Sequence, residues 1–338
     1  MKRIAITLGD PAGIGPEIIA KAFTQAPELT QGCFVAGDLA CLRRGAAAAA
    51  GERPPLPIAL VGSVQELAQV PPRCIPLLQV GAPLEAPPPW GQVNEAAGRL
   101  AANAVLWAAS AALRGEVAAI VTAPLHKEAL SAAGLPYPGH TELLQAEAAA
   151  HAGVALERMP VRMMLANDEL RTVLVSIHVA LRQALEAVTF ANVRETLRIT
   201  DAALAAMLGR RPRIAVAGLN PHAGEGGLFG REEIEVIAPA LQDARAAGLD
   251  VHGPFAPDTV FMRARRGEFD VVVAMYHDQG LIPVKYLGVE KGVNVTLGLP
   301  LVRTSPDHGT AFDIAGTGRA DASSLVEAIR MAKRLAGG

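Results

Sequence analysis

The stretch "RIAITLGDPAGIGPEIIAKAFTQA", from Arg3 to Ala26, shows the alternation of strand and helix that continues along the chain. Its first part, "RIAITL", is a continuous apolar run typical of a buried strand, and "PEIIAKAFTQA" has the apolar spacing of a helix. A loop with three glycines joins them, at Gly9, Gly13 and Gly15. Strand, loop and helix in this order indicate a parallel sheet covered by helices.

The same alternation continues over most of the chain. A chain of 338 residues is too long for one ordinary core and long enough for two domains. We therefore predict an α/β fold of two domains with mainly parallel sheets. Further strands are expected at 33–38, 118–124, 161–165, 172–178, 213–220, 270–278 and 292–300. Further helices are expected at 94–115, 140–153, 192–209 and 231–248.

Composition argues against several classes of protein. The chain has 31 basic and 33 acidic residues, so its formal charge is -2, and no basic cluster of the kind that binds nucleic acid or a membrane surface stands out. No uncharged apolar run reaches the length of a membrane span, about 18 residues. Three cysteines, without a CxxC pair, fit a reduced compartment. We expect a cytoplasmic protein with no nucleic-acid or membrane partner.

Three histidines follow three of the predicted strands. His178 ends "TVLVSIH", His222 follows "RIAVAGL", and His277 follows "DVVVAMY". Ligands bind at the carboxyl ends of strands in open α/β sheets, and three imidazoles there could hold a divalent metal with one position open. Asp278 could support such a site from outside. Alternatively, each histidine only bonds to the backbone at its strand end.

The motif "GHTE" places His140 and Thr141 at the start of a predicted helix. Free amides at a helix start, with a hydroxyl and an imidazole, can hold an anion such as phosphate. The alternative, that Thr141 only caps the helix, is equally open. Lys285, Asn294 and Arg303 lie near predicted strand ends and could bind a phosphate or carboxylate.

Two familiar phosphate-binding patterns are absent from the sequence. The glycine-rich loop from Gly218 to Glu233 lacks the lysine of a nucleoside-triphosphate loop, and no predicted strand is followed by GxGxxG. In the first loop, Glu17 would oppose a pyrophosphate at the helix start. Asp258, beside Pro257, is either a site carboxylate or a turn residue.

Nine motifs occur together and in order, and with them the chain resembles the 4-hydroxythreonine-4-phosphate dehydrogenase family of pyridoxal phosphate biosynthesis. The resemblance runs from Arg3 to Met331. Its motifs are "GDPAGIGPE", "TAPLHK", "GHTE", "SIH", "GLNPHAGEGG", "AMYHDQG", "VKY", "GVNVTLGLP" and "RTSPDHGTAFDIAG".

The resemblance implies a role for each matching position. The metal ligands of the family fall on His178, His222 and His277. Its substrate-contacting residues fall on His140, Thr141, Lys285, Asn294 and Arg303. Members are homodimers whose active site is shared between subunits, with a histidine of the partner chain completing the metal site.

A wider likeness concerns the cofactor. The dehydrogenases of isopropylmalate and isocitrate carry a similar "GDGIGPE" and a motif similar to "HGTAFDIAG" (His308 to Gly316). This likeness implies a comparable fold with the active site in a cleft between the domains, and an NAD site. The site residues would be Gly9, Asp10, Gly13, Gly15, His308 and Asp313.

In this reading, Asp313 accepts hydrogen bonds from a ribose 2′-hydroxyl and would repel a 2′-phosphate, which favours NAD over NADP. Those enzymes hold magnesium or manganese with carboxylates, whereas this chain offers imidazoles. Zinc is therefore the expected ion, with magnesium, manganese, cobalt or nickel as alternatives.

The expected activity is oxidation of 4-phosphooxy-L-threonine at C3 by NAD, followed by decarboxylation, with Asp258 or Lys285 as base. Alternatives are a related phosphorylated four-carbon acid (erythronate or threonate phosphate), a cyclic dihydrodiol, or a binding protein without catalysis. The expected domains are 1–125 with 300–338, on the cofactor side, and 126–299, which binds metal and substrate and forms the dimer.

Overall fold

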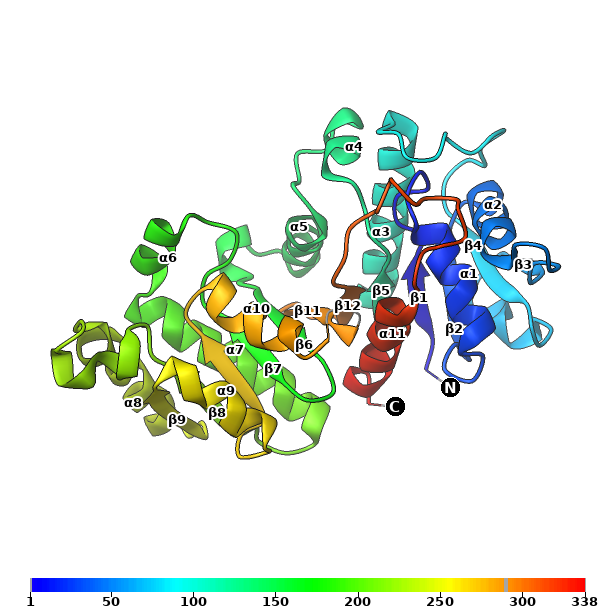
Figure 1. The fold of residues 1–338 in the computed structure, drawn as a ribbon. Coiled ribbons are helices and arrows are strands. Elements are labelled where there is room, and N and C mark those ends of the chain that lie inside the picture. The colour runs from blue at the N-terminus through cyan, green and yellow to red at the C-terminus, as the bar shows by residue number, and fades with distance from the viewer. Residues whose placement is uncertain (1, 289–290, 338) are drawn as a thin grey trace. The chain divides into compact units, whose positions relative to one another are not determined.

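The computed structural model describes residues 2–288 and 291–337, and these residues form two compact units. The first unit comprises Met1–Pro160 and Leu299–Gly338, and the second comprises Val161–Gly298. Figure 1 shows the first and last segments of the chain, blue and red, within one unit. Residues 126–160 lie in the first unit, whereas the predicted division placed them in the second domain, which also included the undescribed residues 289–290.

The first unit contains a fully parallel sheet in the strand order β3-β4-β2-β1-β5-β12. Its register aligns Ile4 with Cys33 on one side and with Ala119 on the other. The central strands have no exposed residue, as expected for a sheet covered on both faces. The bounds are β1 (Ile4–Thr7), β2 (Cys33–Gly37), β3 (Ile58–Val61), β4 (Ile75–Gln79), β5 (Ala119–Thr122) and β12 (Arg303–Pro306).

The helices of this unit begin and end where the sequence supplies suitable residues. Pro16 lies in the first turn of α1, and the Asp38 carboxylate caps α2 by accepting from the Cys41 N–H at 3.0 Å. Gly153 ends α5 in the left-handed conformation. The bounds are α1 (Gly15–Gln25), α2 (Leu39–Ala50), α3 (Glu95–Leu113), α4 (Lys127–Ala132), α5 (His140–Ala152), α11 (Ser323–Leu335) and the short 3₁₀ segments η1 (Val64–Gln69) and η2 (Leu156–Arg158).

Helix α3 is the one described helix that is long and apolar enough to cross a membrane when judged by length and composition alone. Half of it is buried, and it packs against β1, β2 and β5. Its buried face is a stripe of small residues, mostly alanines, which allows close approach to the sheet. A core helix of this kind meets the same criterion, and the packing of α3 matches that explanation.

The second unit contains the strand order β11-β6-β7-β10-β8-β9. Strands β7, β10, β8 and β9 are parallel, but β6 pairs antiparallel with both β11 and β7. Among the described strands of this sheet β6 alone runs against the others, so the sheet is mainly parallel, as predicted. The bounds are β6 (Arg162–Ala166), β7 (Arg171–Leu174), β8 (Ile214–Ala217), β9 (Val251–Phe255), β10 (Val271–Ala274) and β11 (Val293–Leu297).

Helices cover this second sheet as well. Thr189 caps α7 by accepting from the Asn192 N–H at 3.2 Å, and Gly209 ends the same helix in the left-handed conformation. The bounds are α6 (Leu181–Ala187), α7 (Phe190–Leu208), α8 (Ala238–Ala246), α9 (Pro257–Arg265), α10 (His277–Tyr286), the 3₁₀ segment η3 (Pro221–Gly227) and the π-helical turn η4 (Glu233–Ile237).

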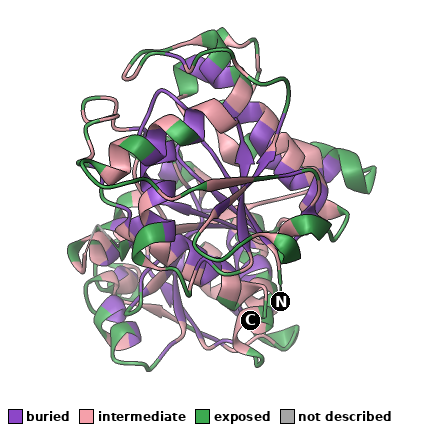
Figure 2. Cartoon of the chain, turned by 90° about the vertical axis from the view of Figure 1, so that its right-hand side faces the viewer, coloured by how far each residue is buried: buried purple, intermediate pink, exposed green. Residues whose placement is uncertain are grey.

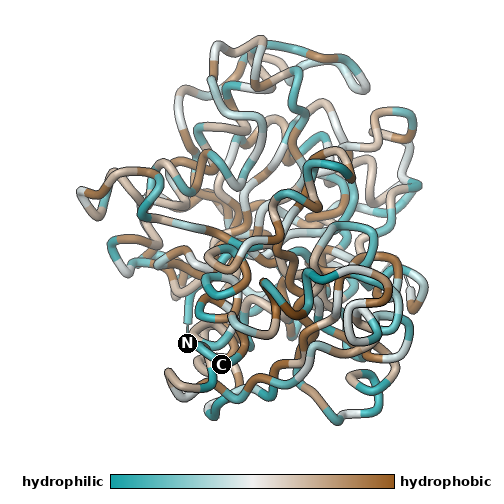
Figure 3. The backbone as a smooth tube through the Cα atoms, turned by 90° about the vertical axis from the view of Figure 1, so that its left-hand side faces the viewer, coloured by the Kyte–Doolittle hydropathy of each residue, from teal (hydrophilic) through white to brown (hydrophobic). Residues whose placement is uncertain are grey.

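Apolar side chains fill the space between sheet and helices within each unit. Figure 2 shows buried residues in purple along the strands and exposed residues in green on outer helix faces and loops. In Figure 3 hydrophobic segments, brown, are prominent in the interior. One buried cluster in the first unit centres on Phe34, Val105 and Ile120, and one in the second unit on Leu174, Val272 and Val284. The α/β fold with mainly parallel sheets is confirmed.

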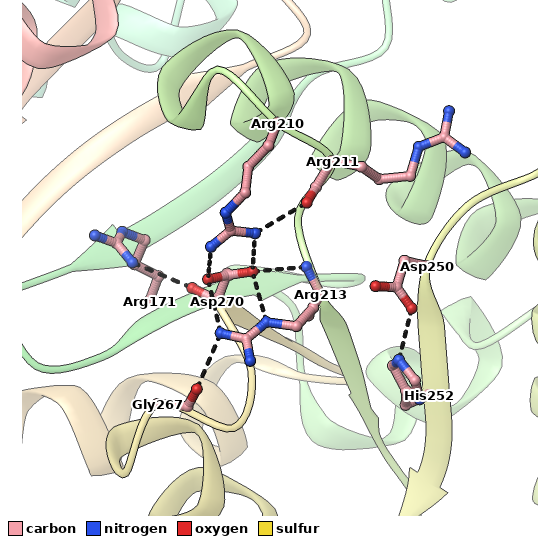
Figure 4. A network of polar contacts seen from close by, with 8 residues as sticks. All are labelled: Arg171, Arg210, Arg211, Arg213, Asp250, His252, Gly267 and Asp270. Carbon is pink, nitrogen blue, oxygen red and sulfur yellow. Dashed lines mark hydrogen bonds and ion pairs between the residues drawn. The ribbon is translucent and has the colours of Figure 1, made fainter.

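A charged network closes the amino ends of the strands in the second unit (Figure 4). Asp270, which precedes β10, accepts from Arg210 Nη1 at 2.9 Å and Nη2 at 2.7 Å, and from the backbone N–H of Arg213 at 2.7 Å. The hydrogen bonds from Arg210 and then from Arg213 hold the pKa of this carboxyl well below its ordinary value. The network fixes the end of the sheet opposite to the predicted site.

A buried ion pair joins the two ends of the chain in the first unit. The Glu17 carboxylate, 0% exposed, lies 2.9 Å from Lys21 Nζ and accepts from the backbone N–H groups of Ala320 at 2.9 Å and Gly318 at 3.3 Å. Lys21 Nζ also donates to the carbonyl oxygens of Gly318 and Ala320 at 2.7 and 2.6 Å. The charge of Glu17 is thus paired and enclosed, so our expectation that it opposes a pyrophosphate is wrong.

Replacing Glu17 with alanine should destabilise the protein by about 3 kcal/mol, because Lys21 and two backbone amides lose their buried acceptor. Urea unfolding followed by circular dichroism measures this loss. Glu28→Ala, an exposed control in the same unit, should change stability by less than about 0.5 kcal/mol. Equal unfolding midpoints for the two variants would show that the pair does not anchor the fold.

Candidate functional site

The predicted metal-binding histidines follow three neighbouring parallel strands of the second unit. His178 comes after β7, His277 after β10 and His222 after β8, and β10 pairs with both of the others. Because parallel neighbours end at the same edge of a sheet, their carboxyl-end loops lie beside one another. The strand order therefore explains why residues far apart in sequence are candidates for one site.

Two of the three imidazoles lie together. The ring centroids of His178 and His277 are 5.6 Å apart, with the rings tilted by 47°. His277 Nδ1 is 2.7 Å from Asp278 Oδ1, so its Nε2 is the nitrogen left for a ligand. A carboxylate on the second nitrogen is the usual way in which a metal-binding imidazole is oriented. The pair His178 and His277, with Asp278 behind it, has the donor set of a metal site.

His222 lies in a strained turn. Five successive residues, 222–226, have left-handed φ angles between 42° and 81°, and three of them are not glycine: His222, Ala223 and Glu225. His178 also has a positive φ, 49°. Left-handed backbone costs roughly 1–2 kcal/mol for each residue other than glycine, and such strain collects at functional positions. The sequence alone gave no sign of this conformation.

In the part of the chain that the structure describes, the donors form an incomplete metal-binding cluster. Within residues 2–288 and 291–337, no group of three or more His, Cys, Asp or Glu side chains is placed to hold an ion. The ring of His222 lies 6.1 Å from that of Phe229. The donors fit a metal in part, through His178 and His277, and His222 stays a predicted third ligand.

Helix α5 begins at the residue that the sequence predicted. Its N-cap is Gly139, which offers no side chain, and His140 and Thr141 occupy the first turn. The alternative role of Thr141 as the cap is therefore wrong. The first amides of a helix without a side-chain cap need another partner, and an anion can supply it.

A buried guanidinium lies beside this helix start, within the first unit. Arg303, at the beginning of β12, is 4% exposed and donates from Nε and Nη2 to Thr122 Oγ1 at 3.1 and 2.8 Å. Burial lowers its pKa to about 10. The pKa of His140 lies well below its ordinary value, through burial first and the charge of Arg303 second. His140 Nε2 is buried and has no hydrogen-bond partner in the described part of the chain.

The remaining predicted substrate and catalytic residues belong to the second unit. Asn294 lies in β11 opposite Leu165, and Lys285 lies half-buried in the last turn of α10. Asp258 is an exposed residue in the first turn of α9, a favourable position for a carboxylate. The structure explains Asp258 by helix geometry alone, so its role as a base stays a prediction.

The glycines of the first loop are packed against the chain itself. A Cβ would lie 2.4 Å from Pro124 O at Gly9, 2.8 Å from Thr310 Cβ at Gly13, and 2.4 Å from Leu8 O at Gly15. Ile14 N–H donates to Thr310 O at 3.0 Å. The loop and the "HGTAFDIAG" segment are thus adjacent in the first unit, although their predicted contact with a dinucleotide stays a prediction.

Asp10 follows β1 and His126 follows β5, at the place in the first sheet where the strand order switches from one side of β1 to the other. From β1 the chain proceeds to β2 on one side, while β5 pairs with β1 on the other. Ligands of open α/β sheets bind at such a point. Asp10 is 0% exposed, and its Oδ1 accepts from the Ala12 N–H at 2.8 Å. Burial raises the pKa of Asp10, while that hydrogen bond and the nearby His126 oppose the rise.

Sequence reasoning missed His126 and its contacts. Its ring stacks on Phe312, with centroids 4.7 Å apart and an interplanar angle of 15°. His126 Nδ1 and Asp10 Oδ2 are both buried without a hydrogen-bond partner among the described residues. The signal was present, because "TAPLHK" puts His126 just after a predicted strand, as "SIH" does for His178.

The two last predicted cofactor residues lie in the loop after β12. His308 Nδ1 lies 3.0 Å from the Gly309 carbonyl oxygen, and its Nε2 is buried and unpartnered within the ranges described. Asp313 is exposed. Both positions are compatible with a bound cofactor, and the roles of His308 and Asp313 as cofactor contacts stay predictions.

Two cavities lie away from the predicted site residues. One, of about 310 Å³, is in the first unit and is lined by residues that include Phe23, Cys33 and Cys74. The other, of about 340 Å³, is in the second unit and is lined by residues that include Arg171 and Asp270. Both lie at the amino ends of strands, the edge that open α/β sheets do not normally use for ligands.

Comparison with known proteins identifies the family. A family model described as "Pyridoxal phosphate biosynthetic protein PdxA" matches residues 29–332. The chain belongs to this family. Its resemblance to the 4-hydroxythreonine-4-phosphate dehydrogenases, which the motifs indicated, is therefore confirmed, and the chain is a dehydrogenase by family.

Individual relatives of this PdxA-family chain carry two names. A "4-hydroxythreonine-4-phosphate dehydrogenase" of Beijerinckia indica subsp. indica is 51% identical over 335 residues, 98% of this chain and 94% of the relative. A "D-threonate 4-phosphate dehydrogenase" of Salmonella typhimurium is 49% identical over 340 residues, 99% of each. The crystal structure of 4-hydroxythreonine-4-phosphate dehydrogenase from Klebsiella pneumoniae has a TM-score of 0.88 and 44% identity, and covers 100% of this chain and 98% of that one.

The His140 imidazole, beside Arg303, should have a pKa well below its ordinary value, because burial and, second, the guanidinium both lower it. Folding stability should accordingly fall as the pH drops below the unfolded value of about 6.5, since the unfolded chain binds the proton more readily. NMR titration of the imidazole, assigned with His140→Asn, measures the pKa. Arg303→Met should raise it only in part, because burial is the larger cause. A value at or above about 6.5 in the unmodified protein would contradict this environment.

Proposed function

We propose that the chain oxidises 4-phosphooxy-L-threonine at C3 with NAD and a divalent metal, and that the product then loses CO₂ to give 3-amino-2-oxopropyl phosphate. The family and the Beijerinckia relative support the dehydrogenase and its phosphorylated substrate. The metal and the cofactor are proposed on the site residues described above, and the decarboxylation on the family resemblance.

The observation that carries the proposal is the position of His140 beside Arg303 at the start of α5. A cation buried within the first unit lies beside the uncapped start of α5, next to an imidazole nitrogen that has no partner among the residues described. A phosphate oxygen bound here would accept from His140 Nε2 and from the guanidinium of Arg303. Thr122 Oγ1 orients that guanidinium, so the substrate would be held in a fixed position.

A metal ion would be held by His178 and His277, with His222 as the predicted third ligand. Zinc is the ion that imidazole donors favour, with magnesium, manganese, cobalt or nickel as alternatives. When bound, the ion would lower the pKa of the C3 hydroxyl and polarise the carbonyl that forms. Asp278 would hold the His277 ring in place through the 2.7 Å contact to Nδ1.

NAD would lie against the first unit, where the Gly9–Gly15 loop meets residues 308–316. This surface lies at the carboxyl ends of the strands, at the topological switch point of the sheet, where nucleotides bind in folds of this type. When bound there, NAD would supply the acceptor for the hydride that leaves C3. Asp313, exposed in that loop, is the proposed partner of the ribose hydroxyls and the reason for a preference for NAD over NADP.

The base that takes the hydroxyl proton is proposed to be Lys285 or Asp258. Lys285 is half-buried at the end of α10, the helix that begins with His277, whereas Asp258 is exposed. We keep both residues as candidates for the base. We also retain Thr141 and Asn294 as proposed substrate contacts.

A second candidate substrate is D-threonate 4-phosphate, because the Salmonella relative with that name is almost as similar as the Beijerinckia one. Threonate carries a hydroxyl where phosphooxythreonine carries an amine, and both present the same phosphate to His140 and Arg303. Erythronate phosphate is the corresponding stereoisomer. We propose a cytoplasmic homodimer for either activity, on the family resemblance.

NADH formation with a panel of phosphorylated acids tests the proposal. We expect turnover of 4-phosphooxy-L-threonine, or of D-threonate 4-phosphate if the second candidate is correct, with loss of activity after chelation and recovery with zinc. NADP should be a much poorer oxidant. His222→Ala should lower kcat/KM by at least about 100-fold, because a metal ligand is lost.

His151→Ala, which removes an exposed histidine of α5, is the matched control and should leave activity unchanged. Full activity of His222→Ala with normal metal content would contradict the metal-dependent mechanism. Absence of turnover for all phosphorylated acids, with metal and NAD present, would contradict the proposed reaction.

A further inference from the structure

The loops that carry His222 and His277 are joined by one side chain. Gln279, in the first turn of α10, donates from Nε2 to the Gly218 carbonyl oxygen at 2.8 Å. Its Oε1 accepts from the Met275 backbone N–H at 2.7 Å. Gly218 directly follows β8 and Met275 directly follows β10. A single amide thus spans the carboxyl ends of two neighbouring strands.

A buried carboxylate fixes the next residues of the His222 loop. Glu233, 3% exposed, accepts from the backbone N–H groups of Leu219 and Asn220, both at 2.7 Å, on Oε1. Its Oε2 accepts from Asn220 Nδ2 at 3.0 Å. The left-handed turn begins two residues after Asn220, so Gly218, Leu219 and Asn220 form a fixed base for it.

The loop after β7, which carries His178, is also hydrogen-bonded to the end of β10. Ser176 Oγ donates to the Met275 carbonyl oxygen at 3.1 Å, and the Val175 N–H donates to Ala274 O at 2.9 Å. Met275 therefore receives contacts from the His178 side through its carbonyl oxygen and from Gln279 through its N–H. Through these contacts, the loops after β7, β10 and β8 form one connected backbone framework.

We propose that Gln279 is a positioning residue that sets the distance between the His222 and His277 loops and so prepares the metal site. Three features support this role. Gln279 bonds to backbone atoms on both loops and is two residues from His277. The turn that carries His222 is strained, so it needs external support to keep one conformation. Both hydrogen-bonding ends of the amide are used, so no apolar or shorter side chain can replace it.

This inference rests on the metal site of the proposed function, but it concerns metal affinity rather than the reaction. Partners of this kind that lie outside the ligand shell typically contribute 10–100-fold in metal affinity. Loss of Gln279 should therefore lower the affinity for the ion by about that factor, since the ligands must then be ordered when the ion binds.

The test uses the full-length protein stripped of metal by a chelator and titrated with Co²⁺, whose visible spectrum reports affinity and coordination. Gln279→Met should bind Co²⁺ about 10–100-fold more weakly and with an altered spectrum. Gln279→Glu keeps the acceptor for Met275 but cannot donate to Gly218, so its affinity should be intermediate. Gln242→Met, at an exposed glutamine of α8, is the matched control and should bind Co²⁺ as the unmodified protein does.

Thermal unfolding of the metal-free proteins separates positioning from a general loss of fold. We expect Gln279→Met to lose Co²⁺ affinity while the melting temperature of its metal-free form stays close to that of the unmodified protein. Unchanged Co²⁺ affinity and spectrum in Gln279→Met would overturn it, as would equal affinities for Gln279→Met and Gln279→Glu. If the unmodified protein binds Co²⁺ and these expectations hold but no phosphorylated acid reduces NAD, the proposed reaction fails while the role of Gln279 stands.

Discussion

The arrangement of the first unit depends on the buried pair of Glu17 and Lys21. These side chains, one turn apart on α1, bind both the amide and the carbonyl groups of Gly318 and Ala320. The interaction holds the C-terminal segment against a helix formed by the first residues of the chain. Because residues 308–316 lie between β12 and this anchor, it also keeps them beside the glycine loop, where Ile14 bonds to Thr310. The proposed cofactor surface therefore follows from a structural ion pair.

In the second unit, three histidines from separate loops lie at one edge of the sheet. Parallel pairing of β7, β10 and β8 places the loops side by side. Side chains then fix the loops, with Ser176 and Gln279 bonded to Met275, and Glu233 bonded to Leu219 and Asn220. Strain at His178 and His222 is maintained by this framework. Such an arrangement is expected where ligand geometry matters more than local backbone stability.

Much of the fold could be predicted from apolar periodicity, but certain features could not. Continuous apolar runs such as "RIAITL" and "DVVVAMYHD" identify strands β1 and β10, yet an apolar run does not reveal direction, and β6 runs antiparallel to both of its neighbours. Strand β3 is short and partly exposed, and it was missed. Among candidate site residues, His140 was found because it begins a helix, whereas His126 becomes visible only when β1 and β5 are known to pair. The two backbone amides that donate to Glu17, those of Gly318 and Ala320, lie some 300 positions along the chain, and periodicity cannot detect them.

The central claim is that the loops after β7, β10 and β8 form a metal site in this dehydrogenase. The most direct measurement is anomalous X-ray scattering from crystals of the protein grown with Zn²⁺. We expect an anomalous peak at about 2.0–2.1 Å from imidazole nitrogens of His178, His222 and His277. A well-ordered crystal with zinc bound elsewhere, or with no peak at these three histidines, would contradict it.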